Sequence, residues 1–136
     1  MIPKFRAWHK TWEEMGKVKR IRFDDEGNVT TVLFRGRDLG TNTHADEIEL
    51  MQSTGLKDKN GVEIFEGDIL TDGHTLGVLR NHQTLGFYMV DEKGEESFLS
   101  DTVNTEGFEE AKEFMKNSIE IIGNIYENPE LLEVPE

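Results

Sequence analysis

The sequence of 136 residues predicts a mainly β (α+β) protein with one helix. Turn signals built from Gly, Asn and Asp recur about every ten residues, a spacing that is typical of many short strands. The segments between these signals mostly alternate apolar and polar residues or are rich in β-branched side chains, as half-buried strands are. One segment near residues 105–117 has the apolar period of a helix instead.

The N-terminal part predicts a β-meander. Its expected strands are residues 4–8, 18–23 and 29–34. Residues 24–28 supply a turn, because Gly27 and Asn28 both tolerate a positive φ. Residues 36–46 are polar and contain glycine, so we expect an exposed loop, and residues 47–52 alternate as a short strand does.

Two turns divide the middle of the chain. At residues 58–61, Asn60 and Gly61 can both adopt the left-handed conformation that a tight hairpin requires. At the second turn, residues 66–68, Gly67 can take a conformation closed to other residues, and Asp68 can accept hydrogen bonds from nearby backbone N–H groups. A functional site lined by Asp68 is the alternative interpretation. The strands expected after these turns are residues 69–71, 76–81, 86–91 and 95–99, with glycines that suit the bends of a small barrel.

The C-terminal part predicts one helix and a closing strand. The helical stripe consists of Phe108, Ala111 and Met115, at positions i, i+3 and i+7. Asn104 or Thr105 is the expected N-cap. Residues 119–126 read as a final strand, and Pro129 starts a short helical turn.

The totals indicate a soluble intracellular protein. Cysteine is absent, which excludes disulfides, thiolate zinc sites and cysteine nucleophiles and fits a reducing cytoplasm. The apolar runs fall short of the ~20 residues that cross a bilayer, and the first residues lack the apolar stretch of a signal peptide. We therefore expect no association with membranes.

The formal net charge of −13 is unevenly distributed. Residues 1–40 have nine Lys/Arg and six Asp/Glu, whereas residues 91–136 have three and fourteen. The acidic C-terminal third either keeps the protein soluble or forms a face that imitates nucleic acid. Direct binding to nucleic acid is disfavoured because phosphates need a basic surface, although the basic N-terminal stretch could still bind locally.

Motifs for catalysis are missing, so we expect neither an enzyme nor a cofactor or metal. No phosphate loop, dinucleotide fingerprint or nucleophile elbow occurs. Residues 24–28 carry enough oxygen ligands for a hard cation but lack the frame of a calcium loop, so a hairpin turn is the preferred interpretation. No pair of histidines has metal-ligand spacing; the four are His9, His44, His74 and His82.

Aromatic residues give the signal for a binding surface. Trp8, Trp12, Phe87 and Tyr88 could line a peptide groove, although core packing explains most rings of this kind. An outward-facing Trp12 or Tyr88 would mark an interface, because large exposed rings often do. The candidate binding surface therefore consists of Trp8, Trp12 and Tyr88. Its partner would be a protein of unknown identity, copies of this chain included, since exposed strand edges favour self-association.

Three segments resemble the YopX family of bacteriophage and prophage proteins. They are residues 2–8, residues 51–61 continuing through 64–69, and residues 122–131. The resemblance implies a small SH3-like barrel over about residues 62–126. It also implies a single domain over residues 1–136, in which a meander and loop (1–50) precede the barrel, helix and closing strand (51–132).

The resemblance further implies a phage or prophage origin and a bacterial cytoplasm as location. The family has no established activity, so it supplies no catalytic residues. The leading hypothesis is an uncharacterised phage accessory protein that binds proteins or itself without catalysis. The alternatives are an acidic polyanion mimic that inhibits a host protein, and an enzyme with an unrecognised site.

Overall fold

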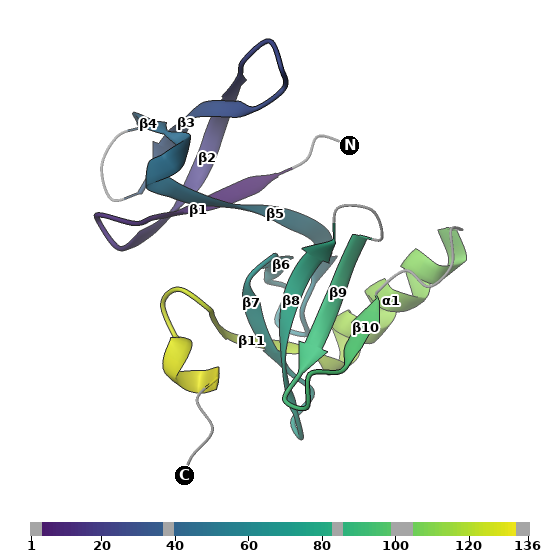
Figure 1. Ribbon diagram of the computed structural model, residues 1–136. Helices are drawn as coiled ribbons and strands as arrows, with labels where there is room; N and C mark the ends of the chain where they lie inside the picture. Colours follow the sequence, from purple (N-terminus) through teal and green to yellow (C-terminus); the bar gives the residue numbers. More distant parts are fainter. Residues whose placement is uncertain (1–3, 37–39, 83–85, 99–104, 133–136) are drawn as a thin grey trace. The chain divides into compact units, whose positions relative to one another are not determined.

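The structure is a computed structural model that describes residues 4–36, 40–82, 86–98 and 105–132 (Figure 1). The chain divides into two compact units, residues 1–52 and residues 53–136. Antiparallel strands dominate the described residues of both units, and α1 (Thr105–Ser118) is the one α-helix among them. The expected mainly β class is therefore confirmed.

The first unit is an antiparallel sheet with the strand order β4-β3-β2-β1-β5. Its elements are β1 (Phe5–His9), β2 (Glu14–Phe23), β3 (Val29–Arg35), β4 (Thr41–His44), the 3₁₀ turn η1 (Ala45–Glu47) and the first half of β5 (Ile48–Lys57). The expected meander of β1, β2 and β3 is confirmed. The loop expected over residues 36–46 is wrong in part, because β4 pairs with β3, and residues 37–39 lie outside the described residues. An edge strand with one buried side chain, Thr43, has no apolar alternation to reveal it.

The core of the first unit lies on one face of its sheet. Ala7, Val32 and Phe34 are each at most 1 % exposed, and Ile48 joins them. The ring of Phe34 fits closely because Gly16, two residues before its cross-strand partner Val18 on β2, has no side chain. A Cβ on Gly16 would lie 2.6 Å from that ring, which no real contact tolerates.

The second unit is an open five-stranded sheet with the order β10-β9-β8-β7-β11. Its strands are β7 (Asp68–Thr71), β8 (Leu76–His82), β9 (Gly86–Asp91), β10 (Glu96–Phe98) and β11 (Glu120–Asn124), and β6 (Glu63–Phe65) pairs with the second half of β5. Within the described residues no ladder joins β10 to β11, so the small barrel expected over residues 62–126 is not closed. The likeness to SH3-type barrels stays a prediction.

Helix α1 covers the apolar interior of the second unit. Met115 and Ile119 pack with Leu56, Ile64 and Leu79 in one buried cluster. The helix expected near residues 105–117 is confirmed, and so is the helical turn that starts at Pro129 (η2, Pro129–Leu132). The side chains of Phe108 and Ala111 and all of Asn104 lie outside the described residues.

Three hairpin turns share one design, Asp-x-x-Gly. They span residues 24–28, 58–62 and 91–95. In each turn the aspartate carboxylate accepts the backbone N–H groups two and four residues later, and all six distances are 2.9 Å. The glycine donates its N–H to the aspartate carbonyl and has a φ of 88°, 80° or 83°. This is the geometry of a type I turn followed by a left-handed bulge residue.

Candidate functional site

The three residues of the expected binding surface lie in different environments. Trp12, in the turn between β1 and β2, is 47 % exposed. Trp8 on β1 and Tyr88 on β9 are half-buried and have other contacts. Trp8 and Trp12 belong to the first unit and Tyr88 to the second. Trp12 is therefore the most exposed of the three residues.

Trp12 is held in place by an aromatic cluster, which consists of His9, Trp12 and Phe34. The rings of Trp12 and His9 stack in parallel, with centroids 3.9 Å apart and an angle of 5°. The Phe34 ring is tilted against both, at centroid distances of 5.6 Å to His9 and 6.2 Å to Trp12. Because His9 is 3 % exposed and Phe34 is 1 % exposed, the surface ring of Trp12 rests on a buried base.

A hydrogen bond fixes the same turn. The backbone N–H of Trp12 donates to Nδ1 of His9 at 3.2 Å, so this ring nitrogen is the acceptor of the turn. The next residue, Glu13, has a φ of 49°, and it is the one non-glycine with a positive φ in the described chain. Side chains rarely adopt this conformation, and it persists where surrounding contacts enforce it.

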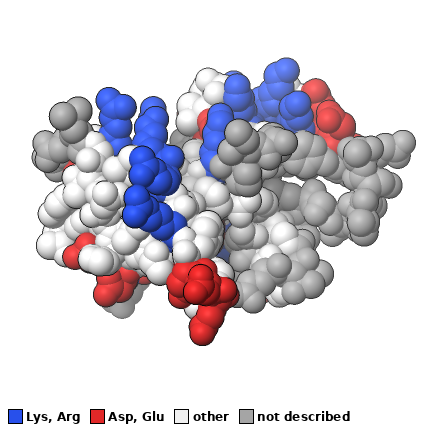
Figure 2. Space-filling model, turned by 90° about the horizontal axis from the view of Figure 1, so that it is seen from above, with Lys and Arg blue, Asp and Glu red and all other residues white. Residues whose placement is uncertain are grey.

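The second surface feature is a basic face on the other side of the first sheet. The basic face consists of Lys17, Arg20, Arg22 and Arg35, all exposed. The strand register explains the grouping, since Lys17 lies opposite Arg35 while the neighbouring pair Val18 and Phe34 faces the core. A bulge between Val18 and Arg20 keeps Arg20 and Arg22 on this face. Figure 2 shows Lys and Arg side chains in two separate groups on the face in view, with Asp and Glu side chains also on this face.

The basic face lacks neutralising partners in the part of the chain that the structure describes. None of its four cations forms an ion pair there, whereas Lys10 pairs with Glu49 at 3.3 Å. Like charges opposite each other on adjacent strands are destabilising. The Lys17–Arg35 pair is therefore a cost to the fold that a bound anion would relieve.

An acidic counterpart lies in the second unit. Residues 1–52 have nine Lys/Arg and nine Asp/Glu, a balance of zero, whereas residues 53–136 have six and nineteen, a balance of −13. Helix α1 presents three exposed carboxylates on the side away from buried Met115, and we call Glu109, Glu110 and Glu113 the acidic ridge. Phe114, beside the ridge, is 48 % exposed.

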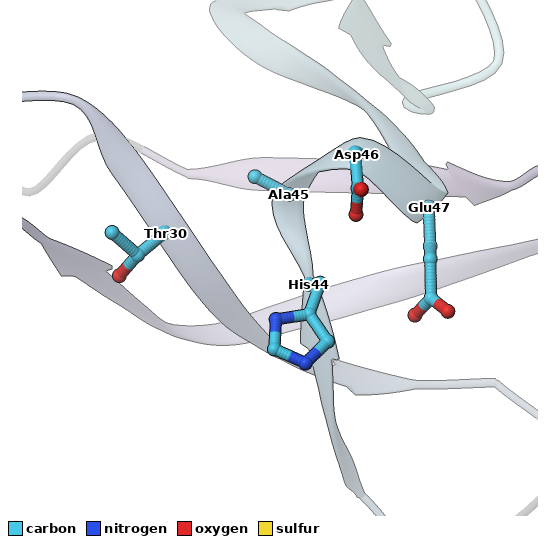
Figure 3. Close-up of a pocket in the computed structure, with 5 residues that line it drawn as sticks. All are labelled: Thr30, His44, Ala45, Asp46 and Glu47. Atoms are coloured by element: carbon cyan, nitrogen blue, oxygen red, sulfur yellow. The ribbon is translucent and has the colours of Figure 1, made fainter.

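An open depression in the first unit is lined by Thr30 and by residues 44–47 (Figure 3). The His44 ring and the Glu47 carboxylate extend toward the same side, and Thr30 comes from β3. His44, Asp46 and Glu47 are all exposed to water. A catalytic site needs enclosed, convergent polar groups, so this depression does not support the enzyme hypothesis.

The four turn residues singled out in the sequence, Asn60, Gly61, Gly67 and Asp68, all lie in or next to turns of the second unit. Gly61 has the expected left-handed conformation, with a φ of 80°, but Asn60 does not. Gly67 has a φ of 90°, donates its N–H to the Leu79 carbonyl at 2.7 Å and accepts from Ile125 N–H at 2.9 Å. Asp68 is 2 % exposed, and its Oδ2 accepts the N–H of Phe65 at 2.8 Å. These contacts hold the 66–68 turn between β6 and β7.

The acidic residues of the turns are already engaged by backbone donors. The N–H of Asn28 and other turn donors lower the pKa of Asp24, and the N–H groups of Thr75 and His74 lower the pKa of Asp72. The Asp24 carboxylate, considered above for a hard cation, thus accepts hydrogen bonds within its own turn. In the described ranges no three His, Asp or Glu side chains group as metal ligands would.

Sequence reasoning missed the His9–Trp12 stack and the shared role of the turn aspartates. The Asp-x-x-Gly repeat was a readable signal, because it occurs at three predicted hairpins. The stack had no readable signal in the sequence, because the two rings are brought together by the turn that follows the end of β1 at His9. No helix among the described residues is long and apolar enough to span a membrane.

Comparisons with known proteins place the chain in a family. No curated protein matches it. The chain is similar to the crystal structure of protein EF1440 from Enterococcus faecalis, with 31 % identity over 98 % of this chain and 99 % of that one and a TM-score of 0.67. The family model described as YopX protein matches residues 4–133. The chain therefore belongs to the YopX family.

Proposed function

We propose that this protein is a non-catalytic bacteriophage or prophage accessory protein that binds proteins, copies of itself included, in the bacterial cytoplasm. The observation that carries the proposal is Trp12, a large ring at the surface that is stacked on a buried base. Tryptophan is enriched among the few residues that dominate interface energies. A ring already fixed in the free protein loses little side-chain entropy on binding.

The test is the replacement of Trp12 by alanine, with capture of partners from a bacterial lysate on immobilised protein. We expect Trp12→Ala to weaken retention of a wild-type partner by about 30-fold, because truncating a central ring costs about 2 kcal/mol of binding. The matched control is Phe23→Ala, which removes a ring that is 60 % exposed elsewhere on the first unit. Equal retention by wild type and both variants would contradict a role for Trp12.

The second candidate function is imitation of a polyanion, and the charge of −13 on residues 53–136 favours it. Two carboxylates of the acidic C-terminal third are engaged locally, since Glu120 pairs with Lys59 at 3.7 Å and Glu127 accepts from Asn124 at 3.1 Å. The acidic ridge offers three exposed carboxylates to a basic partner. This function is tested by measuring whether the protein competes with a DNA duplex for a host DNA-binding protein. If the E109K/E110K/E113K variant competes as well as wild type, this function is rejected.

A further inference from the structure

The basic face and the acidic ridge complement each other in charge and length. Side chains two residues apart on a strand project to one face about 6.6 Å apart, the spacing of Arg20 and Arg22. Residues four apart on a helix are separated by about 6 Å along the axis, the spacing of Glu109 and Glu113. A row of carboxylates on a helix therefore matches a row of cations on a strand.

Apolar contacts reinforce this match. Leu33 lies opposite Arg20 on β3 and is half-buried among the cations of the basic face. Phe114 projects beside the acidic ridge and is 48 % exposed. The stems of Lys and Arg side chains are themselves apolar. A helix on the basic face would bury Phe114 against Leu33 and these stems while its carboxylates reach the cations.

We propose that the basic face of one copy binds the acidic ridge and Phe114 of helix α1 in a second copy. The proposal rests on the self-association in the proposed function and specifies its surfaces. The two patches differ, so the contact is heterologous and builds rings or open chains. A nucleic acid is the weaker occupant, because four cations are few for a polyanion.

The experiment measures self-association by sedimentation velocity over a range of protein concentrations, at about 50 mM and about 500 mM NaCl. We expect wild type to associate at low salt and to dissociate at high salt. The K17E/R20E/R22E variant should associate at least about tenfold more weakly at low salt, because it reverses the basic face. The matched control is K57E/R80E/K93E, which makes the same charge change at exposed residues of the second unit and should associate as wild type does.

A second variant tests the contact from the other side. E109K/E110K/E113K reverses the acidic ridge and should be as weak as K17E/R20E/R22E when each variant is alone. Mixing the two at equal concentration should restore association, because each supplies a patch that complements the other. Circular dichroism would verify that both are folded, and failure of the mixture to associate would overturn the proposal.

Three other outcomes would also overturn it. If wild type is monomeric at every protein and salt concentration, the protein does not self-associate. Capture of a partner through Trp12 then tests the proposed function separately. If association does not depend on the salt concentration and is unchanged in both variants, the protein self-associates through other surfaces. Tight binding of a fluorescein-labelled single-stranded oligonucleotide, lost in K17E/R20E/R22E, would assign the basic face to nucleic acid.

Discussion

Replacing Asp58 with alanine is expected to lower the free energy of unfolding of residues 53–136 by about 3–4 kcal/mol. Asp58 is 2 % exposed, and its carboxylate accepts the N–H groups of Asn60 and Val62 at 2.9 Å and of Ile121 at 3.0 Å. Alanine would leave these donors without their acceptor. The third bond joins positions 63 residues apart, so its loss also removes one of the links between the 58–62 turn and β11. Urea unfolding with hydrogen exchange at the Ile121 amide measures the effect.

The matched control for Asp58→Ala is Asp72→Ala. Asp72 also accepts two backbone N–H groups in a turn, those of His74 and Thr75, but this turn is exposed. Water can replace its carboxylate there, so we expect a much smaller loss of stability. Losses of equal size in the two variants would show that burial and the bond to Ile121 are unimportant.

Asp58 also predicts how stability depends on pH. Burial raises the pKa of this carboxyl, but the N–H groups of Ile121, Val62 and Asn60 together with Lys59 outweigh burial, so the pKa lies below its ordinary value. A lowered folded-state pKa stabilises the protein above the unfolded-state pKa of about 3.9, and this stabilisation is lost as the pH falls through the folded-state value. We expect the urea midpoint of wild type to drop more between pH 7 and pH 3 than that of Asp58→Asn. Parallel curves would contradict this role of the carboxylate.

Most of the fold could be predicted from the sequence because its turns are specified locally. The aspartate of each Asp-x-x-Gly turn bonds to donors two and four residues away, and the glycine supplies the left-handed residue. Such contacts need no distant partner, so a short window of sequence contains the whole cause. The alternation of Arg20 and Arg22 with Ile21 likewise indicates locally which of these side chains share a face.

The remaining features depend on pairing between distant segments. The sequence does not show that β4 pairs with β3, or that β5 continues through Gly55, whose φ is 78°. Closure of a barrel depends on whether the two edge strands meet, which no local pattern states. Regular alternation would place Phe23 on the face of Ile21, yet Phe23 is 60 % exposed, and the register shifts between Arg22 and Phe23.

The candidate site shows the same division. Sequence reasoning singled out Trp12, but its rigidity comes from His9 and from Phe34 on another strand. The basic face needs the register that sets Arg35 opposite Lys17. The basic composition of residues 1–40 and the shared face of Arg20 and Arg22 were readable, whereas the addition of Lys17 and Arg35 to that face was not.

Replacing Phe34 with alanine is expected to destabilise residues 1–52 by about 3–5 kcal/mol. The ring is 1 % exposed, it packs with Ala7, Val32 and Ile48, and it fills the space left by Gly16. The backbone around Gly16 cannot move far enough to fill the space of the missing ring, so alanine at position 34 leaves a cavity. The same change removes the tilted contact beneath Trp12 and should weaken partner capture without touching the exposed face of that ring.

Tryptophan fluorescence reports this effect selectively, because both tryptophans of the chain, Trp8 and Trp12, lie in residues 1–52. We expect the urea midpoint by fluorescence to fall sharply in Phe34→Ala. Phe23→Ala is the matched control, since it deletes an equal ring that is 60 % exposed and should shift the midpoint little. A loss below about 1 kcal/mol for Phe34→Ala would mean that the ring is loosely packed. Trp12 would then lack the rigid base on which its role in binding depends.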